Sequence, residues 1–260
     1  MTSDNPTFLP GVPSDHILSR LSASPGNEIG SGKILSPESS AALAINCLGW
    51  FIDRPSSLPP FTGIDFGSPV VQVDIEFQAR FPWSGGRHSW LDGVVITSTH
   101  LVGIESKRFE PFRDQKSATF SDAYDRDVWG EHMKPFTDLR DALRTRSLVY
   151  RWLDAAQLIK HGFGLVTEAR RRGLKPALLY LYAEPDALHG KPIVASTFNA
   201  HRAEIDDFAN RIAGAGVQFA STSYRDWIAD WPEDDVELTA HGRRVLGAFM
   251  TDSFAGTALF

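Results

Sequence analysis

Hydrophobic and polar positions follow two different periods along this chain and divide it into helices and strands. Residues 41–51 are apolar nearly all round, as expected of a helix that packs against a sheet. We expect this helix to begin at Ser36, Pro37 and Glu38, with Ser36 as its cap. Residues 70–77 alternate apolar and polar side chains, which predicts a half-exposed strand. Later in the chain we expect a helix over 146–172, broken around 162–164, buried strands over 176–183 and 217–221, and helices over 199–213, 225–231 and 238–250.

Residues 91–107 contain two short apolar runs, rich in β-branched residues, that predict an antiparallel hairpin. If the turn centres on residues 98–99, Asp92 lies opposite Glu105, and Lys107 shares their face. Opposed carboxylates repel each other, and a hard divalent cation bound between them would remove that repulsion. Two alternatives stay open. The three residues could be an exposed charged face with a local ion pair, and a one-residue slip would separate the two acids.

The order of elements is helix, three strands, helix, strand, helix, strand, helix, which predicts an α/β fold with a mixed β-sheet flanked by helices on both faces. Residues 1–35 are rich in Pro, Ser, Gly and Asn and predict an irregular N-terminal arm. We expect residues 36–260 to form a single domain. Within it, the mixed segment at about 108–145 is an insertion that should contain short helices.

The composition is that of a soluble globular protein, with 42% hydrophobic and 22% charged residues among 260. No apolar run is long enough to span a membrane and no signal peptide is recognisable, so we expect a cytoplasmic protein. Cys47 has no partner for an internal disulfide and should be a buried thiol. No complete phosphate-binding loop, calcium loop, zinc motif or serine-nucleophile elbow is present.

The net charge of −6 does not favour nucleic-acid binding, but local basic patches would suffice for phosphate contacts. These patches could equally be solvated helix faces. The candidate clusters are Arg140, Arg144, Arg146 and Arg151, then Arg170, Arg171, Arg172 and Lys175, then Arg243 and Arg244.

Asp92, followed one strand later by Glu105, Ser106 and Lys107, resembles the D…ExK signature of the PD-(D/E)xK nuclease superfamily, although Leu91 stands where the usual proline precedes the aspartate. The runs at 105–112 and 157–161 resemble a branch of bacterial restriction-endonuclease-like proteins. The similarity covers about residues 36–183 and is weaker beyond. It implies the restriction-endonuclease-like αβββαβ core.

The resemblance implies a metal-dependent nuclease that hydrolyses DNA phosphodiester bonds, with endonucleolytic cutting expected. The implied cofactor is Mg²⁺, with Mn²⁺ as a substitute, and the implied ligands are Asp92, Glu105 and the backbone carbonyl of Ser106. Lys107 would orient the attacking water or stabilise the phosphorane. We prefer this electrostatic role because a lysine that acts as a base needs a strongly lowered pKa.

In such nucleases the second core helix often places a polar residue against the active site. The resemblance therefore makes Gln157 a candidate site residue, and His161 or Lys160 a candidate phosphate contact. Gln157 and His161 are one helical turn apart and share a face. The alternative is a solvent-facing stripe on an amphipathic helix.

The first helix of the family often contributes an acidic residue. Glu38 is the candidate here and Glu28 its competitor, although Glu38 could act only on the electrostatics of the helix N-terminus. Arg87 and His88 could line the same cleft and contact nucleic acid, or be ordinary surface residues.

Two other functions remain open from sequence. One is a catalytically inactive nucleic-acid-binding or defence-complex module that keeps the nuclease-like fold. The other is a metal-dependent hydrolase with a different substrate, which the pI of about 5.7 leaves open. The sequence does not distinguish DNA from RNA, and it leaves a homodimer as one option for the assembly.

Overall fold

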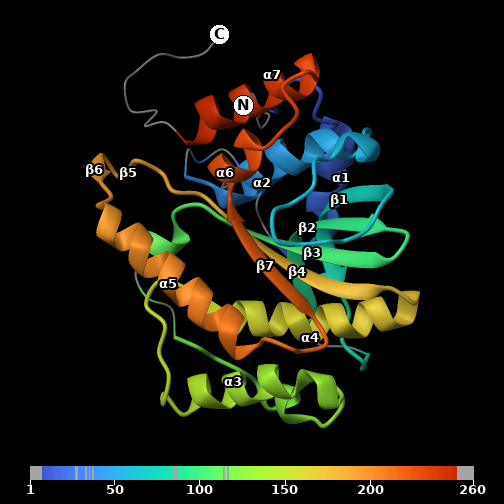
Figure 1. Ribbon diagram of the computed structural model, residues 1–260, viewed down its shortest axis with the longest axis vertical. Helices are drawn as coiled ribbons and strands as arrows, with labels where there is room; N and C mark the ends of the chain where they lie inside the picture. Colours follow the sequence, from blue (N-terminus) through green and yellow to red (C-terminus); the bar gives the residue numbers. More distant parts are fainter. Residues whose placement is uncertain are drawn as a thin grey trace.

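A five-stranded mixed sheet forms the centre of the computed structural model, which describes residues 8–26, 29–32, 34, 36, 38–84, 87–113, 115 and 117–250 (Figure 1). The strand order is β1-β2-β3-β4-β7. The strands are β1 (Val70–Ala79), β2 (Ser89–Thr97), β3 (His100–Lys107), β4 (Lys175–Tyr182) and β7 (Gln218–Ser223). The first three pair antiparallel, and β4 and β7 continue the sheet in parallel with β3. The predicted α/β class with a mixed sheet is confirmed.

Helices cover both faces of this sheet (Figure 1). One face carries α1 (Ser14–Ala23), α2 (Ser40–Leu48), α6 (Tyr224–Ala229) and α7 (Val236–Phe249). The other carries α3 (Lys134–Arg144), α4 (Ala155–Arg172) and α5 (Ala195–Arg211). Each face encloses its own hydrophobic core. Short elements complete the description: η2 (Gly49–Phe51), η3 (Pro55–Ser57), η4 (Glu110–Phe112), η5 (Asp122–Asp125), η6 (Glu131–Met133) and the ribbon of β5 (Ala187–Leu188) with β6 (Lys191–Pro192).

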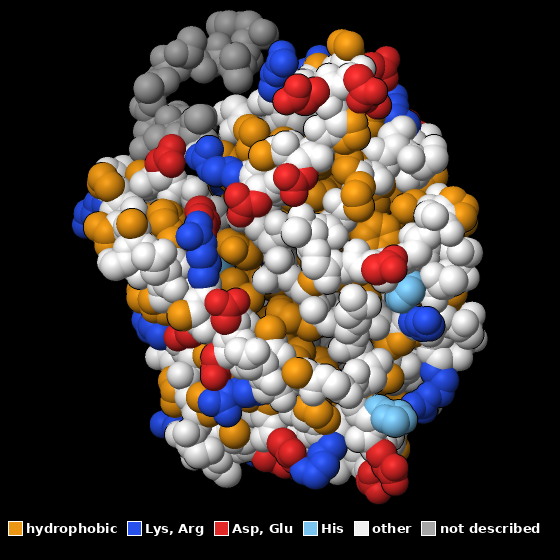
Figure 2. Space-filling model, viewed as in Figure 1, with side chains coloured by type: hydrophobic (Ala, Val, Ile, Leu, Met, Phe, Trp, Pro, Cys, Tyr) orange, Lys and Arg blue, Asp and Glu red, His pale blue; other side chains and the backbone are white. Residues whose placement is uncertain are grey.

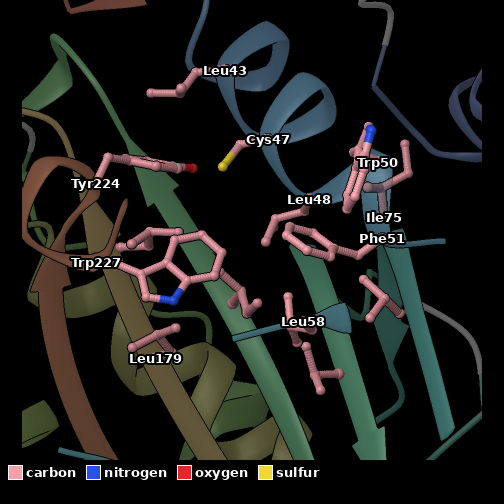
Figure 3. Packing of buried hydrophobic residues seen from close by; sticks show 14 of the residues in the cluster. Leu43, Cys47, Leu48, Trp50, Phe51, Leu58, Ile75, Leu179, Tyr224 and Trp227 are labelled. Carbon is pink, nitrogen blue, oxygen red and sulfur yellow. The ribbon is translucent and has the colours of Figure 1, made fainter. Parts of the chain in front are cut away.

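Helix α2 is apolar on all sides because it is buried on all sides. Leu43 and Cys47 are fully buried, and Phe51 in the adjoining η2 packs near Ile75 of the sheet and Trp227 of α6 (Figure 3). Helix α7 contacts the same helix from outside. The predicted buried thiol of Cys47 is confirmed, and burial raises the pKa of that thiol well above its ordinary value.

The predicted start of this helix is wrong by one turn. Helix α2 begins at Ser40, and the Ser39 hydroxyl accepts a hydrogen bond from the Ala42 N–H at 3.0 Å. Ser36 instead accepts from the Glu38 N–H in a preceding turn, and Pro37 lies outside the described residues. Both serines satisfy the local capping pattern, so the choice between them depends on where the helix packs.

The predicted helix over 146–172 is shorter and is not broken. It begins at Ala155, where the Asp154 carboxylate accepts from the Gln157 N–H at 3.0 Å, and it runs without interruption to Arg172. The glycines that suggested a break serve close packing. A Cβ at Gly162 would lie 2.3 Å from a ring carbon of Phe136 on α3.

The predicted irregular arm contains a ten-residue helix, α1, so that part of the prediction is wrong. Ile17 and Leu21 of α1 are buried in the core, and Arg20 and His16 reach Asp74 on β1. The short helices predicted within 108–145 are confirmed. In the part of the chain that the structure describes, no helix has the length and hydrophobicity needed to cross a membrane.

Candidate active site

The hairpin of β2 and β3 has the register predicted from its turn. Gly93 pairs with Ile104 and Ile96 with Leu101, which leaves residues 98–99 in the turn. The same register carried one residue further places Asp92 opposite Glu105. There the Ser106 N–H donates to Oδ2 of Asp92 at 2.7 Å. The two carboxylates therefore share one face of the central hairpin.

The surroundings of Asp92 disfavour a negative charge on its carboxyl group. Its side chain is partly buried, and burial raises its pKa well above the ordinary value. The neighbouring charge of Glu105 raises that pKa further, while Lys107 and the Ser106 N–H lower it by less. A carboxylate in this position would bind a cation readily because the cation would offset both unfavourable effects.

Glu105 is different, since both of its oxygens have nitrogen neighbours, an ammonium and an imidazole. It is 1% exposed; Oε1 pairs with the Lys107 ammonium, and Oε2 lies 2.7 Å from Nε2 of His161, although these two atoms are not aligned for a hydrogen bond. Burial acts to raise the pKa of Glu105, but Lys107 and His161 hold it at about 2. Glu105 is therefore ionised at neutral pH.

His161 lies on α4 beneath the acidic pair. It is 2% exposed, and its Nδ1 hydrogen-bonds to the hydroxyl of Ser89 at the start of β2. Gly103 explains how α4 comes so close to β3, because a Cβ there would lie 2.8 Å from Leu165. The burial of His161 does not suit the phosphate contact expected from sequence. Its contacts are those of a residue that positions Glu105.

Lys107 is held as an ammonium ion by the acids around it. Burial alone would lower its pKa, but Glu105, Asp92 and Glu110 raise it above the ordinary value. A cavity of about 30 Å³, enough for a water molecule, adjoins Lys107 and is also lined by Glu110, Asp154 and Tyr180. The lysine thus stands between the acidic pair and a small polar opening.

Glu110 is a site residue that the sequence analysis missed. It follows β3 in η4 and contributes to the raised pKa of Lys107. Its Oε1 accepts from the Ser40 hydroxyl at the start of α2, and its Oε2 accepts from the Arg108 N–H at 3.0 Å. The only available signal was its position three residues after Lys107, within the segment that carries the resemblance.

Glu38, the acid expected from the first helix, has other partners. Its oxygens lie 2.7 Å from the Arg113 guanidinium and 2.8 Å from Nδ1 of His189. The first core helix therefore contacts the site through the Ser40–Glu110 hydrogen bond. The competing candidate Glu28 lies outside the described residues.

The two other candidates on α4 differ in the direction of their side chains. Gln157 is partly buried and, one turn before His161, faces the same side of the helix. Lys160 points elsewhere, with its ammonium 5.3 Å from the centre of the Phe120 ring, and burial lowers its pKa. Neither residue lines the small cavity beside Lys107.

Arg87 and His88 precede β2 and do not line that cavity either. Arg87 is exposed, and His88 accepts a hydrogen bond from the Phe81 N–H at 3.1 Å. Their expected place in the same cleft as the acidic pair stays a prediction.

The oxygen donors at the hairpin suit a hard divalent cation. Among the described residues, no group of three or more His, Cys, Asp or Glu is placed to hold a metal ion, so a cation here would need Asp92, Glu105 and a backbone oxygen. The Lys107 carbonyl accepts from the Ala183 N–H on the β4 side at 2.8 Å. Because successive carbonyls of a strand point to opposite sides, the Ser106 carbonyl points toward β2 and Asp92. Two carboxylates and a carbonyl, completed by waters, are donors that Mg²⁺ accepts.

The basic clusters found in the sequence are partly neutralised. Arg171 and Arg172 both pair with Glu168, at 3.1 and 3.0 Å, and Arg144 pairs with Asp125. Figure 2 shows cationic and acidic side chains interspersed over the face in view. Any nucleic-acid contact on this face must therefore use individual basic side chains, because acidic side chains interrupt the basic surface.

A mixed sheet of this strand order, with an opposed Asp–Glu pair and a buried lysine on its central hairpin, is typical of the restriction-endonuclease-like class. The family described as "Restriction Endonuclease associating with ARP" has a model that matches residues 30–242, and the chain belongs to this family. Comparisons with curated proteins and with solved structures gave no match.

Proposed function

We propose that this protein is an endonuclease that hydrolyses DNA phosphodiester bonds in a Mg²⁺-dependent reaction, with Mn²⁺ as a substitute. Membership of a restriction endonuclease family supports hydrolysis of DNA. The observation that carries the proposal is the opposed pair of Asp92 and Glu105 beside a buried lysine, in which the charge of Asp92 is incompletely compensated.

Asp92, Glu105 and the Ser106 carbonyl would hold the cation. A bound Mg²⁺ supplies an activated water and neutralises charge on the phosphate, which are the two requirements of phosphodiester hydrolysis. The Ser106 N–H keeps one Asp92 oxygen in place and leaves the other available as a ligand.

Lys107 serves as an electrostatic group. A general base must lose its proton near neutral pH, whereas the acids around Lys107 raise its pKa. A fixed ammonium in a buried site stabilises the negative charge that develops on the phosphate oxygens in the transition state. His161 and Ser89 contribute by holding Glu105 and α4 in position.

The test is cleavage of mixed linear, circular and single-stranded DNA by the purified protein in Mg²⁺ or Mn²⁺, with EDTA as the blank. Lys107→Ala and Asp92→Ala should each reduce cleavage by at least about a hundredfold, with circular dichroism to check that each variant is folded. Lys191→Ala, at an exposed lysine of β6 outside the basic clusters, is the matched control and should cut like the wild type. Cleavage by either site variant at the wild-type rate would refute the assignment.

A calorimetric titration with Mg²⁺ separates this proposal from its alternative. If the wild type neither cuts nor binds metal, the protein is a nucleic-acid-binding module that retains the nuclease fold. The family's name also describes association with ARP, and we propose by extension that this chain works in a complex. A DNA substrate and a single buried thiol support a cytoplasmic location.

A further inference from the structure

A groove of about 570 Å³ lies beside the candidate active site. Gln115 and residues 117–119 form one wall, and the connection from α3 to the first turn of α4 forms the other. Gln115, Tyr150 and Asp154 line both this groove and the small cavity at Lys107. A ligand in the groove would therefore reach the residues that surround the catalytic lysine.

The walls of the groove combine cationic, hydroxyl and apolar groups. Arg144 and Arg146 lie on one side, and Ser117 and Thr119 on the other. Val149, which also lines the groove, is 60% exposed. Guanidinium groups bind phosphates, hydroxyls bind phosphates and sugars, and apolar surfaces contact bases and sugars. This is the chemistry of a nucleotide site.

Arg146 is the more available of the two cations. Arg144 pairs with Asp125 and lies near the Phe120 ring, whereas Arg146 is exposed at the rim. Its φ of 58° belongs to the left-handed region that favours glycine. The chain thus places an arginine at the groove where glycine would be less strained.

The size of the groove restricts what can occupy it. Its volume falls within the range of about 300–1,000 Å³ that is usual for small-molecule sites. That space suits a few atoms' breadth of one strand, a nucleotide or two, and is too small to enclose a double helix. We propose that the groove binds unpaired nucleotides of the substrate strand next to the scissile phosphate, with Arg146 on their backbone. This inference rests on the proposed nuclease function.

Binding is tested in EDTA, so that cleavage does not interfere, with the full chain and a short fluorescein-labelled DNA in single-stranded and blunt duplex form. We expect the wild type to prefer the single strand. Arg146→Glu should weaken single-strand binding roughly tenfold at about 50 mM salt and lower the salt slope by about 0.7. Arg146→Gly relieves the backbone strain, so it should fold at least as well and still lose affinity. Lys191→Glu makes the same charge change at an exposed position of β6, outside the groove and the basic clusters, and is the matched control.

Several outcomes would overturn the groove proposal: unchanged binding by both Arg146 variants, equal losses in Arg146→Glu and Lys191→Glu, or equal losses on single-stranded and blunt duplex DNA. Its failure is distinguishable from failure of the nuclease proposal. Unchanged binding by the Arg146 variants of a protein that cuts DNA in Mg²⁺ would reject the groove alone. A selective Arg146 effect in a protein that cuts nothing would support the groove and reject the nuclease.

Discussion

Replacing Asp92 by asparagine should stabilise the metal-free protein while it abolishes cleavage. In an antiparallel pair, opposite residues have Cα atoms about 5 Å apart. Two charges at that separation repel by about 3 kcal/mol at the effective dielectric constant of about 20 that suits protein sites. Lys107 offsets part of this repulsion. The asparagine oxygen can still accept the Ser106 N–H, so we expect a net gain of about 1–2 kcal/mol in the free energy of unfolding.

Replacing Glu105 should have the opposite effect and lower the free energy of unfolding. Glu105→Gln leaves the buried Lys107 without its ion-pair partner, and breaking a buried pair in this way costs about 3–5 kcal/mol. The contrast between the two variants is diagnostic, because two ordinary surface acids would give small and similar effects.

Urea unfolding of the wild type and both variants in EDTA, followed by circular dichroism, measures these differences. A thermal scan checks the same differences, since a change of 1 kcal/mol in the free energy of unfolding shifts the Tm of a chain of this size by about 2–4 °C. Because the folded-state pKa of Asp92 is raised, its charge destabilises the fold above the ordinary carboxyl pKa, and the advantage of Asp92→Asn should vanish as acid protonates Asp92. A less stable Asp92→Asn variant at neutral pH would refute the reasoning.

Mg²⁺ provides an independent check on the same site. At about ten times its Kd, a ligand that binds only the folded state stabilises it by about 1.4 kcal/mol. The wild type should gain this stability, and Asp92→Asn should not. Equal gains in both proteins would place the metal elsewhere.

Two further predictions concern the stability of the helices that pack around the sheet. Burial, and to a lesser extent Arg202, lower the pKa of His201 from 6.5 to about 4, so the stability that it contributes is complete above pH 6.5 and is lost as the pH falls to 4. The loss should reach about 3 kcal/mol. The free energy of unfolding, measured with urea, should therefore vary less with pH in His201→Gln than in the wild type. Gly162→Ala should lower the free energy of unfolding by about 1–3 kcal/mol because the added Cβ clashes with Phe136. Gly247→Ala on α7, where the added Cβ meets nothing within 4 Å, should raise it by up to about 1 kcal/mol. Equal stabilities of the two variants would contradict the packing of α3 on α4.

The elements that local pattern determines were predicted well. The alternation along β1 and the apolar run of β4 indicated strands within two residues of their observed ends. Helix boundaries were less predictable. Asp154 caps α4 and Ser39 caps α2, but other residues nearby satisfied the same local rules. Which cap is used depends on how the helix docks, and no local pattern records that.

For the site, the sequence by itself determined the hairpin, and it predicted the opposition of Asp92 and Glu105 for a turn centred on residues 98–99. The turn and its flanking strands are close in the chain, so local pattern predicts the hairpin, and the pairing of Gly93 with Ile104 agrees with the expected register. Both faces of β2 and β3 are buried, so the apolar pattern alone did not exclude a one-residue slip. The tertiary structure alone decided the rest. Ser89 meets His161 across 72 residues and Ser40 meets Glu110 across 70, and both contacts require that α4 and α2 dock on opposite faces of the sheet. The close fit at Gly103 and the burial of both cores set that docking, so the charges around Lys107 result from long-range packing.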